Sequence, residues 1–457
     1  MAKERYRWTH ELTAYHWFVF LVASGAWLFD CLDQRLFSLA RIPALRSLMV
    51  GAEESVVQAT GKEVTAVFLI GWGIGGLIFG ALGDRYGRAR MLNLTVVIYS
   101  MFTGLTFFST TYWDFAICRF LTGLGVGGVF GLAVALMAET LPDSARAGAL
   151  GMLQILSTVG NVSAGLFLTL SAYLPTGNSL VPAGQPWRYM FLVGAVPALL
   201  VVATGRYLKE PPRWLKAKEE GTLPKGSIFA PYRDLIQDER WRKNLVVGAL
   251  IASTGVIGLW AIGEYAVDLQ RNVFKTYYVN NPPIGITDTN AAIAASVNTA
   301  ISWAYVLNML GAGIGMWIFT KLAIGLGRRP AFAIGFLAAL ITTVLVYWRM
   351  SSPWDAYWMM PLMGAAQLSV FAGFAIYLPE LFPSRLRSTG TSFCYNLGRF
   401  AAAAGSFFSA ILSTRAFGAF ESPLNLRYSA MAMCSIFLVG LLTLPFAPET
   451  KDQPLPE

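Results

Sequence analysis

The chain has few charged side chains and almost no histidine. Charged residues make up 13% of its 457 residues, whereas a soluble domain carries about 25%. Its two histidines, His10 and His16, both lie near the N-terminus, so histidine-based catalysis and histidine metal sites are excluded from the rest of the sequence. The low charge, together with 55% hydrophobic residues, predicts a protein that resides in lipid.

Cysteine is also scarce, and its placement argues against a covalent or metal-bound framework. The four cysteines fall in apolar segments without metal-ligand spacing, at Cys31, Cys118, Cys394 and Cys434. We therefore expect neither disulfides nor a metal. The sequence also lacks a nucleophile–base pair and a nucleotide-binding loop, so it predicts no enzyme activity and no cofactor. The first apolar segment is long and lacks a small-residue cleavage site, so no cleavable signal is expected.

Long apolar runs are what the sequence has in abundance. Its mean hydropathy is +0.52, and runs of roughly 20 apolar residues are typical of membrane helices. The predicted fold is an all-α membrane protein, because a helix satisfies its own backbone hydrogen bonds in lipid. Twelve transmembrane helices are predicted, near residues 15–40, 63–83, 91–110, 113–138, 147–172, 188–208, 244–271, 295–320, 330–349, 354–379, 388–412 and 427–447.

The net charge of +9 is explained by membrane topology, and no binding of nucleic acid is expected. If the N-terminus is cytoplasmic, cytoplasmic segments hold 23 of the 35 Lys and Arg residues and external segments hold 9. The remaining three, Arg35, Arg119 and Arg399, fall within predicted spans. This bias follows the positive-inside rule. It predicts a multi-pass protein of the cell membrane with both termini in the cytoplasm.

The two halves of the sequence repeat. A charged turn that contains Gly87 has a weaker copy at Gly327, 240 residues later. A pattern of Glu, Pro and Arg also recurs, at 139–146 and 380–387. Matched landmarks at nearly one spacing indicate a duplication, so we predict two six-helix halves related by pseudo-twofold symmetry. The predicted parts are an N-terminal half at 1–208, a cytoplasmic central loop at 209–243 and a C-terminal half with a short tail at 244–457.

The turn between spans two and three matches the G-x-x-x-D-R-x-G-R-[RK] signature of the major facilitator superfamily. The residues that carry the match are Gly80, Asp84, Arg85, Gly87, Arg88 and Arg90, with a slight shift at the end, where Ala89 precedes Arg90. Three further strings resemble the same superfamily, with its sugar-porter-like and aromatic-acid:proton symporter branches nearest: Arg119-x-x-x-Gly123 in span four, Glu210-Pro-Pro-Arg213 after span six, and Pro448-Glu449-Thr-Lys451 after span twelve. The resemblance implies two parallel six-helix repeats, a solute site at the midplane between them and a gating role for the turn.

Asp84 is the residue of this turn whose charge could hold one conformation. Its carboxylate can accept hydrogen bonds from Arg85, Arg88 or Arg90, or face the N-terminus of a neighbouring helix. The second copy has Ile324 at the corresponding position, so any latch would be stronger in the first half. The alternative is that the turn only supplies positive charge for topology.

The repeated Glu and Arg residues lie at other cytoplasmic ends of predicted spans. We expect Glu139, Arg146, Glu380 and Arg387 to clamp neighbouring helices as part of the same gate. The alternative is that they are solvated charges at an interface.

Two carboxylates lie deep in span one. Asp30 and Asp33 are three residues apart, hence on one helical face, and ionisable residues inside a span are costly unless they face a cavity or a partner. The pair resembles the D-G-x-D pattern of aromatic-acid:proton symporters, with Cys31 in place of the glycine. Two close carboxylates resist ionising together, so the pair could load and release a proton. Arg119 could pair with one of them, and a static pair with Arg35 is the alternative.

Arg399 is the other deep charge, about eleven residues into span eleven. A buried guanidinium presents a planar fork that suits a carboxylate, so Arg399 is the candidate ligand of an anionic solute, with Tyr395 and Asn396 beside it. The alternative is a structural pair with Glu264 or Asp30.

Span seven carries Trp260, Glu264 and Asp268 at a spacing that predicts one helical face. Glu264 could be a proton-coupling acid in the cavity, whereas Asp268 is better explained as a charge at its mouth. Further polar residues that could line the cavity are Gln154, Asn161, Asn298, Tyr305, Asn308, Gln367 and Tyr377.

Together these features predict a monomeric secondary transporter that moves a small organic acid, aromatic acids included, with protons by alternating access. Its partners would be the solute, protons and membrane lipid. A sugar or polyol porter is the first alternative, although span seven lacks the Gln-Gln pair and Asn that sugar porters use. A uniporter, an efflux carrier and a membrane sensor that does not transport are the others.

Overall fold

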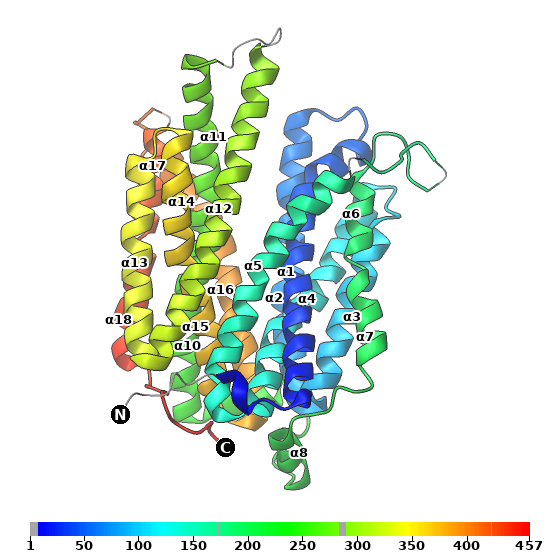
Figure 1. Cartoon of the computed structure of the whole chain (residues 1–457), viewed down its shortest axis with the longest axis vertical. Coiled ribbons are helices and arrows are strands. Elements are labelled where there is room, and N and C mark those ends of the chain that lie inside the picture. The colour runs from blue at the N-terminus through cyan, green and yellow to red at the C-terminus, as the bar shows by residue number, and fades with distance from the viewer. Residues whose placement is uncertain (1–7, 172, 179, 283–288, 422) are drawn as a thin grey trace. The chain divides into compact units, whose positions relative to one another are not determined.

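The computed structural model describes residues 8–457 apart from residues 172, 179, 283–288 and 422. Within that part of the chain, the regular structure is helical and contains no β-strand (Figure 1). The side chains of some further helical residues, Glu264 among them, lie outside the described set. The predicted all-α fold is confirmed.

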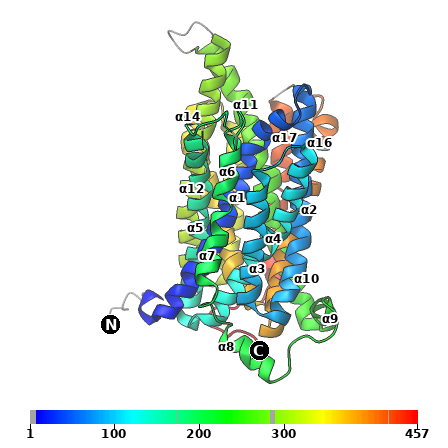
Figure 2. The same ribbon diagram turned by 90° about the vertical axis from the view of Figure 1, so that its right-hand side faces the viewer.

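Each of the twelve predicted spans corresponds to one helix or to consecutive helices. The first half contains α1 (Ala14–Leu48), α2 (Glu54–Tyr86), α3 (Arg88–Thr106), α4 (Tyr112–Thr140), α5 (Asp143–Ser171), α6 (Trp187–Val193) and α7 (Val196–Thr204). The second half contains α10 (Glu239–Ile257), α11 (Gly263–Asn280), α12 (Thr289–Gly325), α13 (Arg328–Arg349), α14 (Pro353–Gln367), α15 (Ser369–Glu380), α16 (Arg387–Ile411), α17 (Leu424–Met433) and α18 (Ile436–Thr443). The central loop forms two short helices. The first, α8 (Pro212–Glu219), lies beyond the ends of the long helices, and the second, α9 (Ala230–Gln237), lies beside the last turns of α2 (Figure 2).

Several helices are longer than the apolar runs that predict them. Within the described ranges, nine helices are long and apolar enough to cross a membrane; the other three predicted spans correspond to α3, to α6 with α7, and to α16, which are shorter or more polar. With 35 residues in α1 and 37 in α12, each exceeds the roughly 30 Å hydrocarbon core at about 1.5 Å per residue. An apolar run ends at the lipid boundary, whereas the helix continues into polar residues. The end of α11 and the beginning of α12 accordingly extend beyond α13 and α14 (Figure 1).

The chain forms two compact units that mix distant segments of the sequence. Unit 1 contains Met1–Leu245, Ala375–Asn396 and Asp452–Glu457, and unit 2 contains Val246–Phe374 and Leu397–Lys451. The second half of α15 and the beginning of α16 thus belong to unit 1, although they lie in the second half of the sequence. As a result, repeated charged residues from both sequence halves meet inside one unit.

Close helix packing in both units depends on glycine. On α2, a Cβ atom added at Gly75 would lie 2.0 Å from the carbonyl oxygen of Leu124 on α4. On α12, a Cβ atom added at Gly315 would lie 2.0 Å from the carbonyl oxygen of Ala365 on α14. Such contacts leave room only for a hydrogen atom, so glycine lets the two helix backbones touch. The two glycines are 240 residues apart and extend the repeat to helix packing.

The turn before α3 and its copy before α13 share one backbone geometry. Gly87 has a φ of 112° and Gly327 a φ of 111°, which glycine adopts without strain. A glutamate carboxylate also occupies the space that a side chain would need. A Cβ atom at Gly87 would lie 2.2 Å from Glu210 Oε1, and one at Gly327 would lie 2.8 Å from Glu449 Oε2. Both the dihedral angle and the neighbouring carboxylate therefore require glycine.

These two glutamates cap the helices that follow the turns. Glu210 accepts hydrogen bonds from the backbone N–H groups of Ala89 (3.1 Å) and Arg90 (3.0 Å) at the start of α3. Glu449 accepts equivalent bonds of 2.9 and 3.0 Å from the first two residues of α13. A carboxylate at this position satisfies free N–H groups and interacts favourably with the helix dipole. The Glu-Pro and Pro-Glu strings of the sequence are therefore helix caps.

An arginine holds each of the same two helices at its other end. Arg188, in α6, donates hydrogen bonds to the carbonyl groups of Phe107 and Ser109, directly after α3. Arg427, in α17, donates to three carbonyl groups at the end of α13. A cation at a helix C-terminus is favourable for the same electrostatic reason. Both α3 and α13 are thus held at each end by the span six and span twelve segments of their own unit.

The Glu449→Gln substitution is expected to lower the free energy of unfolding by about 1 kcal/mol, because it removes the negative charge at the start of α13. Burial raises the pKa of Glu449, but hydrogen bonds from the backbone N–H groups of Arg328, Arg329, Lys451 and Thr450 outweigh burial, so the pKa lies below its usual value. A carboxylate with a lowered pKa stabilises the fold above its unfolded-state pKa. That contribution disappears as the pH falls through the folded-state pKa.

Thermal unfolding between neutral and acidic pH measures this cap. The difference in stability between the wild type and Glu449→Gln should begin to close below about pH 4.3, the pKa of an unperturbed glutamate. Glu421→Gln is the control, since Glu421 is exposed. A stability difference that stayed constant down to the most acidic pH would contradict the assignment.

Candidate functional site

The turn after α2 carries a buried ion pair that caps a helix in unit 1. Asp84 and Arg88 are both 0% exposed and lie 2.9 Å apart. Asp84 also accepts hydrogen bonds from the backbone N–H groups of Ser388 (3.0 Å) and Thr389 (2.8 Å), and from the Thr389 hydroxyl (2.6 Å). The sequence allows several partners for Asp84. In the structure, Asp84 pairs with Arg88 and caps the N-terminus of α16.

The repeated Glu and Arg residues pair with one another in the same unit. Arg387 lies 2.7 Å from Glu139, and Arg88 lies 3.1 Å from it. Arg146 lies 3.9 Å from Glu380. These side chains are at most 4% exposed, so they are not solvated surface charges. The name charged cluster is used below for Asp84, Arg88, Glu139, Arg146, Glu380 and Arg387.

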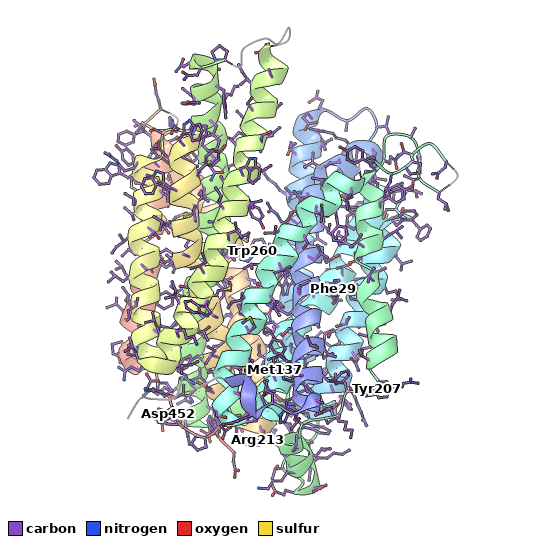
Figure 3. The ribbon with its side chains drawn as sticks, in the orientation of Figure 1. Phe29, Met137, Tyr207, Arg213, Trp260 and Asp452 are labelled. Atoms are coloured by element: carbon purple, nitrogen blue, oxygen red, sulfur yellow. The ribbon has the colours of Figure 1, made fainter. Side chains whose placement is uncertain are left out.

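The central loop contacts unit 1 near the charged cluster. Arg85 of the turn donates a 2.6 Å hydrogen bond to the carbonyl of Gly226 in the loop. Arg213, which lies at the same end as Met137 of α4, pairs with Asp143 at 3.2 Å (Figure 3). Arg85 therefore does not bind Asp84, which was one of the predicted arrangements.

The second copy of the turn lacks the aspartate that caps another span in the first copy. Ile324 stands where the first copy has Asp84, and it is 39% exposed. The carbonyl of the next residue, Gly325, accepts a 2.8 Å hydrogen bond from Lys451. An apolar side chain cannot accept backbone hydrogen bonds, so the two turns share their glycine and their glutamate cap but not the contact to another span.

A second buried polar group lies between α1, α3 and α4 of unit 1. Asp30, Asp33 and Arg119 are each 0% exposed. Arg119 Nη1 lies 3.8 Å from Asp33 Oδ2, and Arg119 Nη2 donates a 2.6 Å hydrogen bond to the Thr106 hydroxyl. The sequence left Arg119 and Arg35 as possible partners of the span one carboxylates. In the structure, the partner of Asp33 is Arg119.

Aromatic rings and a tyrosine complete this group. The Arg119 guanidinium lies 4.8 Å from the centre of the Phe191 ring, a contact that favours a cation out of water. Asp30 accepts a 3.3 Å hydrogen bond from Gln34. Tyr99 of α3 is fully buried. Asp30, Asp33, Tyr99 and Arg119 are called the carboxylate cluster below.

Three aromatic rings from α1, α4 and α16 pack beside a buried glutamine in unit 1. The Phe130 and Tyr395 rings stack with centroids 3.9 Å apart, and Trp27 lies 5.0 Å from Phe130. The Trp27 indole N–H donates a 2.9 Å hydrogen bond to Gln154 Oε1. Two predicted ligand residues, Gln154 and Tyr395, are thus brought together. Trp27 and Phe130 were not predicted, because aromatic residues are frequent in every span.

Arg399 and Asn396 lie on the same helix but in different units. Arg399 is in unit 2 and is 4% exposed. Asn396 is in unit 1 and donates hydrogen bonds to the carbonyl groups of Ser392 (2.8 Å) and Gly127 (3.4 Å). The amide of Asn396 is therefore engaged in packing against α4, whereas Arg399 contributes a buried charge to unit 2.

The helix of span seven is interrupted by a π turn. This turn, Gly258–Ile262, lies between α10 and α11 and contains Trp260, about halfway along the span (Figure 3). The predicted single face for Trp260, Glu264 and Asp268 assumed α-helical spacing throughout. The π turn adds a residue to the repeat between Trp260 and Glu264, whereas Glu264 and Asp268 both lie in α11 at the predicted spacing. Asp268 is exposed, and the side chain of Glu264 lies outside the described residues.

Two of the other predicted cavity residues form hydrogen bonds between helices, and the remaining ones range from buried to exposed. Asn308 donates a 2.9 Å hydrogen bond to the carbonyl of Met360, and Gln367 donates a 2.8 Å bond to the Thr343 hydroxyl, so both amides join helices of unit 2. Of the remainder, Tyr377 is buried, Asn161 and Tyr305 are half-buried, and Asn298 is exposed.

Sequence reasoning missed the polar face of α3. Tyr99, Thr103 and Thr106 are each 0% exposed and lie beside the span one carboxylates and Arg119. Their spacing of four and three residues places them on one side of a helix. That spacing was available in the sequence, but a tyrosine and two threonines stand out little in an apolar span.

The order of the helices and the parallel repeat define the major facilitator fold. The structure resembles that of the E. coli proton:xylose symporter with a TM-score of 0.73, over 97% of this chain and 98% of that chain, at 20% sequence identity. The sequence profile of the family described as sugar (and other) transporter matches residues 47–457. The chain belongs to this family, and it is a multi-pass membrane transporter.

Three relatives match most of the chain. It is 27% identical to a putative metabolite transport protein of Haemophilus influenzae, over 98% of this chain and 100% of the relative. It is 28% identical to a probable 4-methylmuconolactone transporter of Cupriavidus pinatubonensis, over 86% and 83% of the two chains. It is 26% identical to a cis,cis-muconate transport protein of Acinetobacter baylyi, over 95% of each chain.

Proposed function

We propose that this protein is a secondary active transporter that couples the entry of a small organic acid to the entry of a proton. The observation that carries the proposal is the buried pair of Asp33 and Arg119. The pair spans 3.8 Å, which is longer than a hydrogen bond, and both side chains are 0% exposed. A buried carboxylate held this loosely by its counter-charge is well placed to exchange a proton.

Protonation of Asp33 would change the packing of unit 1. A neutral Asp33 no longer attracts Arg119, which then depends on the Thr106 hydroxyl and the Phe191 ring that it already contacts. Asp30, one turn earlier on α1, supplies a second carboxyl to the same buried group. Because α1, α3 and α4 meet there, the proton can favour one arrangement of these helices over another.

Arg399 is the residue that we assign to the solute. Its buried guanidinium can form two parallel hydrogen bonds with a carboxylate. The names of two relatives, which refer to cis,cis-muconate and 4-methylmuconolactone, support an organic acid as the solute class. Within unit 1, the rings of Trp27, Phe130 and Tyr395 form an apolar surface beside Gln154.

The charged cluster is the gate in this proposal. With 23 of the 35 basic residues on the side of the N-terminus, we place both termini and the charged cluster at the cytoplasmic face of the cell membrane. Asp84 caps α16 there, and Glu139 pairs with Arg387. Opening toward the cytoplasm would break these contacts. We assign the chain no catalytic reaction, and we propose that it acts as a monomer.

The Arg399→Ala substitution tests the solute assignment. In a thermal-shift titration of purified protein with cis,cis-muconate, the variant should bind at least about tenfold more weakly than the wild type, because the charge-assisted hydrogen bonds are lost. Arg385→Ala is the matched control, since that arginine is exposed enough to pair with Asp234 at the surface. Wild-type protein that binds xylose and no organic acid would favour the sugar porter instead.

A further inference from the structure

Helix α9 of the central loop packs one face against the rest of unit 1 and leaves the other face uncovered. On the packed face, Leu235 is 0% exposed, and the Tyr232 hydroxyl donates a 2.7 Å hydrogen bond to the carbonyl group of Leu77 in α2. Asp234 Oδ2 lies 3.3 Å from Arg385 Nη1. Leu77 and Arg385 both belong to unit 1, so these contacts fix which face of α9 points outward.

The uncovered face carries large apolar side chains and basic ones. Phe229, directly before α9, is 62% exposed and Ile236 is 55% exposed, and the side chain of Arg233 between them is 69% exposed. Their spacing of four and three residues places them on one side of the helix. Arg242 of α10 adds a second exposed guanidinium, whose Nη1 lies 3.5 Å from the carbonyl oxygen of Ile236. Phe229, Arg233, Ile236 and Arg242 are called the α9 face below.

The contact with Leu77 gives the level of α9 along the membrane spans. Leu77 lies within the predicted apolar span at 63–83, whereas α2 continues to Tyr86. At about 1.5 Å per residue, Leu77 is about 13 Å from the end of α2. The side chain of Tyr232 covers part of that distance, so α9 lies beside the end of a membrane span and not beyond it (Figure 2). The α9 face is therefore at the level of the lipid headgroups.

The acidic residues of this segment leave the α9 face basic. Asp234 lies closer to Arg385 on the packed side (3.3 Å) than to Arg233 (3.9 Å). Asp238 accepts hydrogen bonds from two backbone N–H groups at the start of α10. Glu239 is exposed, and the basic side chains that follow it in α10 are exposed too. Apolar side chains beside free guanidinium groups match a phospholipid, which offers acyl chains and a phosphate.

We propose that the α9 face lies in the headgroup layer of the membrane and binds anionic phospholipid. Phe229 and Ile236 enter the boundary of the acyl chains, while Arg233 and Arg242 bind the lipid phosphate. Helices that lie on a membrane bind it in this way, with the attraction to anionic lipid added to the burial of apolar surface. The α9 face shares no residue with the charged cluster or the carboxylate cluster, and the inference depends neither on the solute nor on the proton.

Thermal unfolding in the presence of lipid tests the two arginines. Purified wild-type protein in detergent should melt at a higher temperature with added phosphatidylglycerol than with added phosphatidylcholine, because a ligand of the folded protein stabilises it. The variant that combines Arg233→Gln with Arg242→Gln should lose at least about half of that difference, since two attractions to the anionic lipid are gone. Lys216→Gln is the matched control, because the Lys216 side chain is 65% exposed on α8, which lies beyond the ends of the long helices (Figure 2). The same difference in the double variant as in the wild type would overturn the proposal, as would an equal rise with inorganic phosphate in place of phosphatidylglycerol.

A fluorescent probe tests whether the apolar residues enter the lipid. Ile236→Cys would carry a nitrobenzoxadiazole probe in proteoliposomes whose acyl chains bear bromine as a quencher. We expect this probe to be quenched at least about twofold more than a probe at Leu215→Cys, an exposed apolar position of α8. Wild-type protein labelled in parallel gives the signal of the native cysteines, which is subtracted. Equal quenching at the two positions would overturn the proposal.

Discussion

Asp33→Asn is expected to abolish uptake of an organic acid driven by a pH gradient, with a loss of at least about a hundredfold, because an amide cannot exchange a proton. Asparagine has nearly the shape of aspartic acid and mimics its neutral state. The variant should therefore keep counterflow exchange, in which solute crosses without net proton movement. Loss of one activity with retention of the other separates proton coupling from folding and from solute binding.

Proteoliposome uptake with and without a pH gradient gives this measurement. Glu219→Gln is the control, since Glu219 is exposed on α8 and its substitution is expected to leave both activities unchanged. Gradient-driven accumulation by Asp33→Asn at the wild-type rate would contradict the assignment of Asp33 to the proton.

Arg387→Gln is expected to have the largest effect on stability. Arg387 is 0% exposed and lies 2.7 Å from Glu139, which is also 0% exposed. Removal of the arginine leaves the buried carboxylate of Glu139 with less positive charge beside it. Breaking a buried ion pair in this way lowers the free energy of unfolding by about 3–5 kcal/mol. Thermal unfolding of the purified variant measures the loss.

A double-mutant cycle separates the pair from its surroundings. The variant that combines Glu139→Gln with Arg387→Gln should recover part of the stability, since it leaves neither charge buried alone. Arg385→Gln is the matched control, because Arg385 is 34% exposed in its pair with Asp234 and such surface pairs contribute at most about 1 kcal/mol. Equal losses from Arg387→Gln and Arg385→Gln would contradict the role of the charged cluster.

The fold could be predicted from the sequence because its signals are local or periodic. Apolar runs mark the twelve spans, and landmarks such as Gly87 and Gly327 repeat at one offset. The helix ends were less accurate, since the chain stays helical after hydrophobicity falls, as in α1 and α12. The π turn around Trp260 was not predicted, because no residue pattern in this span indicates it.

For contacts between distant residues, the sequence limited the candidate partners but did not identify the partner that is used. From the sequence, the candidate partners of Asp84 are three arginines and the N-terminus of a helix. The packing of α2 against α16 determines that the partners are Arg88 and Thr389. The arginines at the far ends of α3 and α13 were overlooked, although Arg-Tyr recurs at Arg188 and Arg427. Nothing in a single sequence marks an arginine as a partner of carbonyl groups, since every residue carries one.

The repeat explains what the two units share, and the departures from it locate the proposed function. Both units keep the turn glycine, the glutamate cap and the arginine at the other end of the capped helix. Only the first half has an acid at the Asp84 position and a tyrosine at the Tyr99 position, where the second half has Ile324 and Ala339. The shared contacts hold helices together, and the unshared acid at Asp84 belongs to the cluster that we propose as the gate.

Proton movement that accompanies solute entry is the most direct test of the account. Purified protein in proteoliposomes would receive cis,cis-muconate from outside while a pH electrode follows a weakly buffered external medium. Symport predicts that the medium becomes more alkaline as the acid enters, and that Asp33→Asn vesicles show no such change. A constant external pH during uptake of the acid, or uptake of xylose with no uptake of any organic acid, would contradict the account.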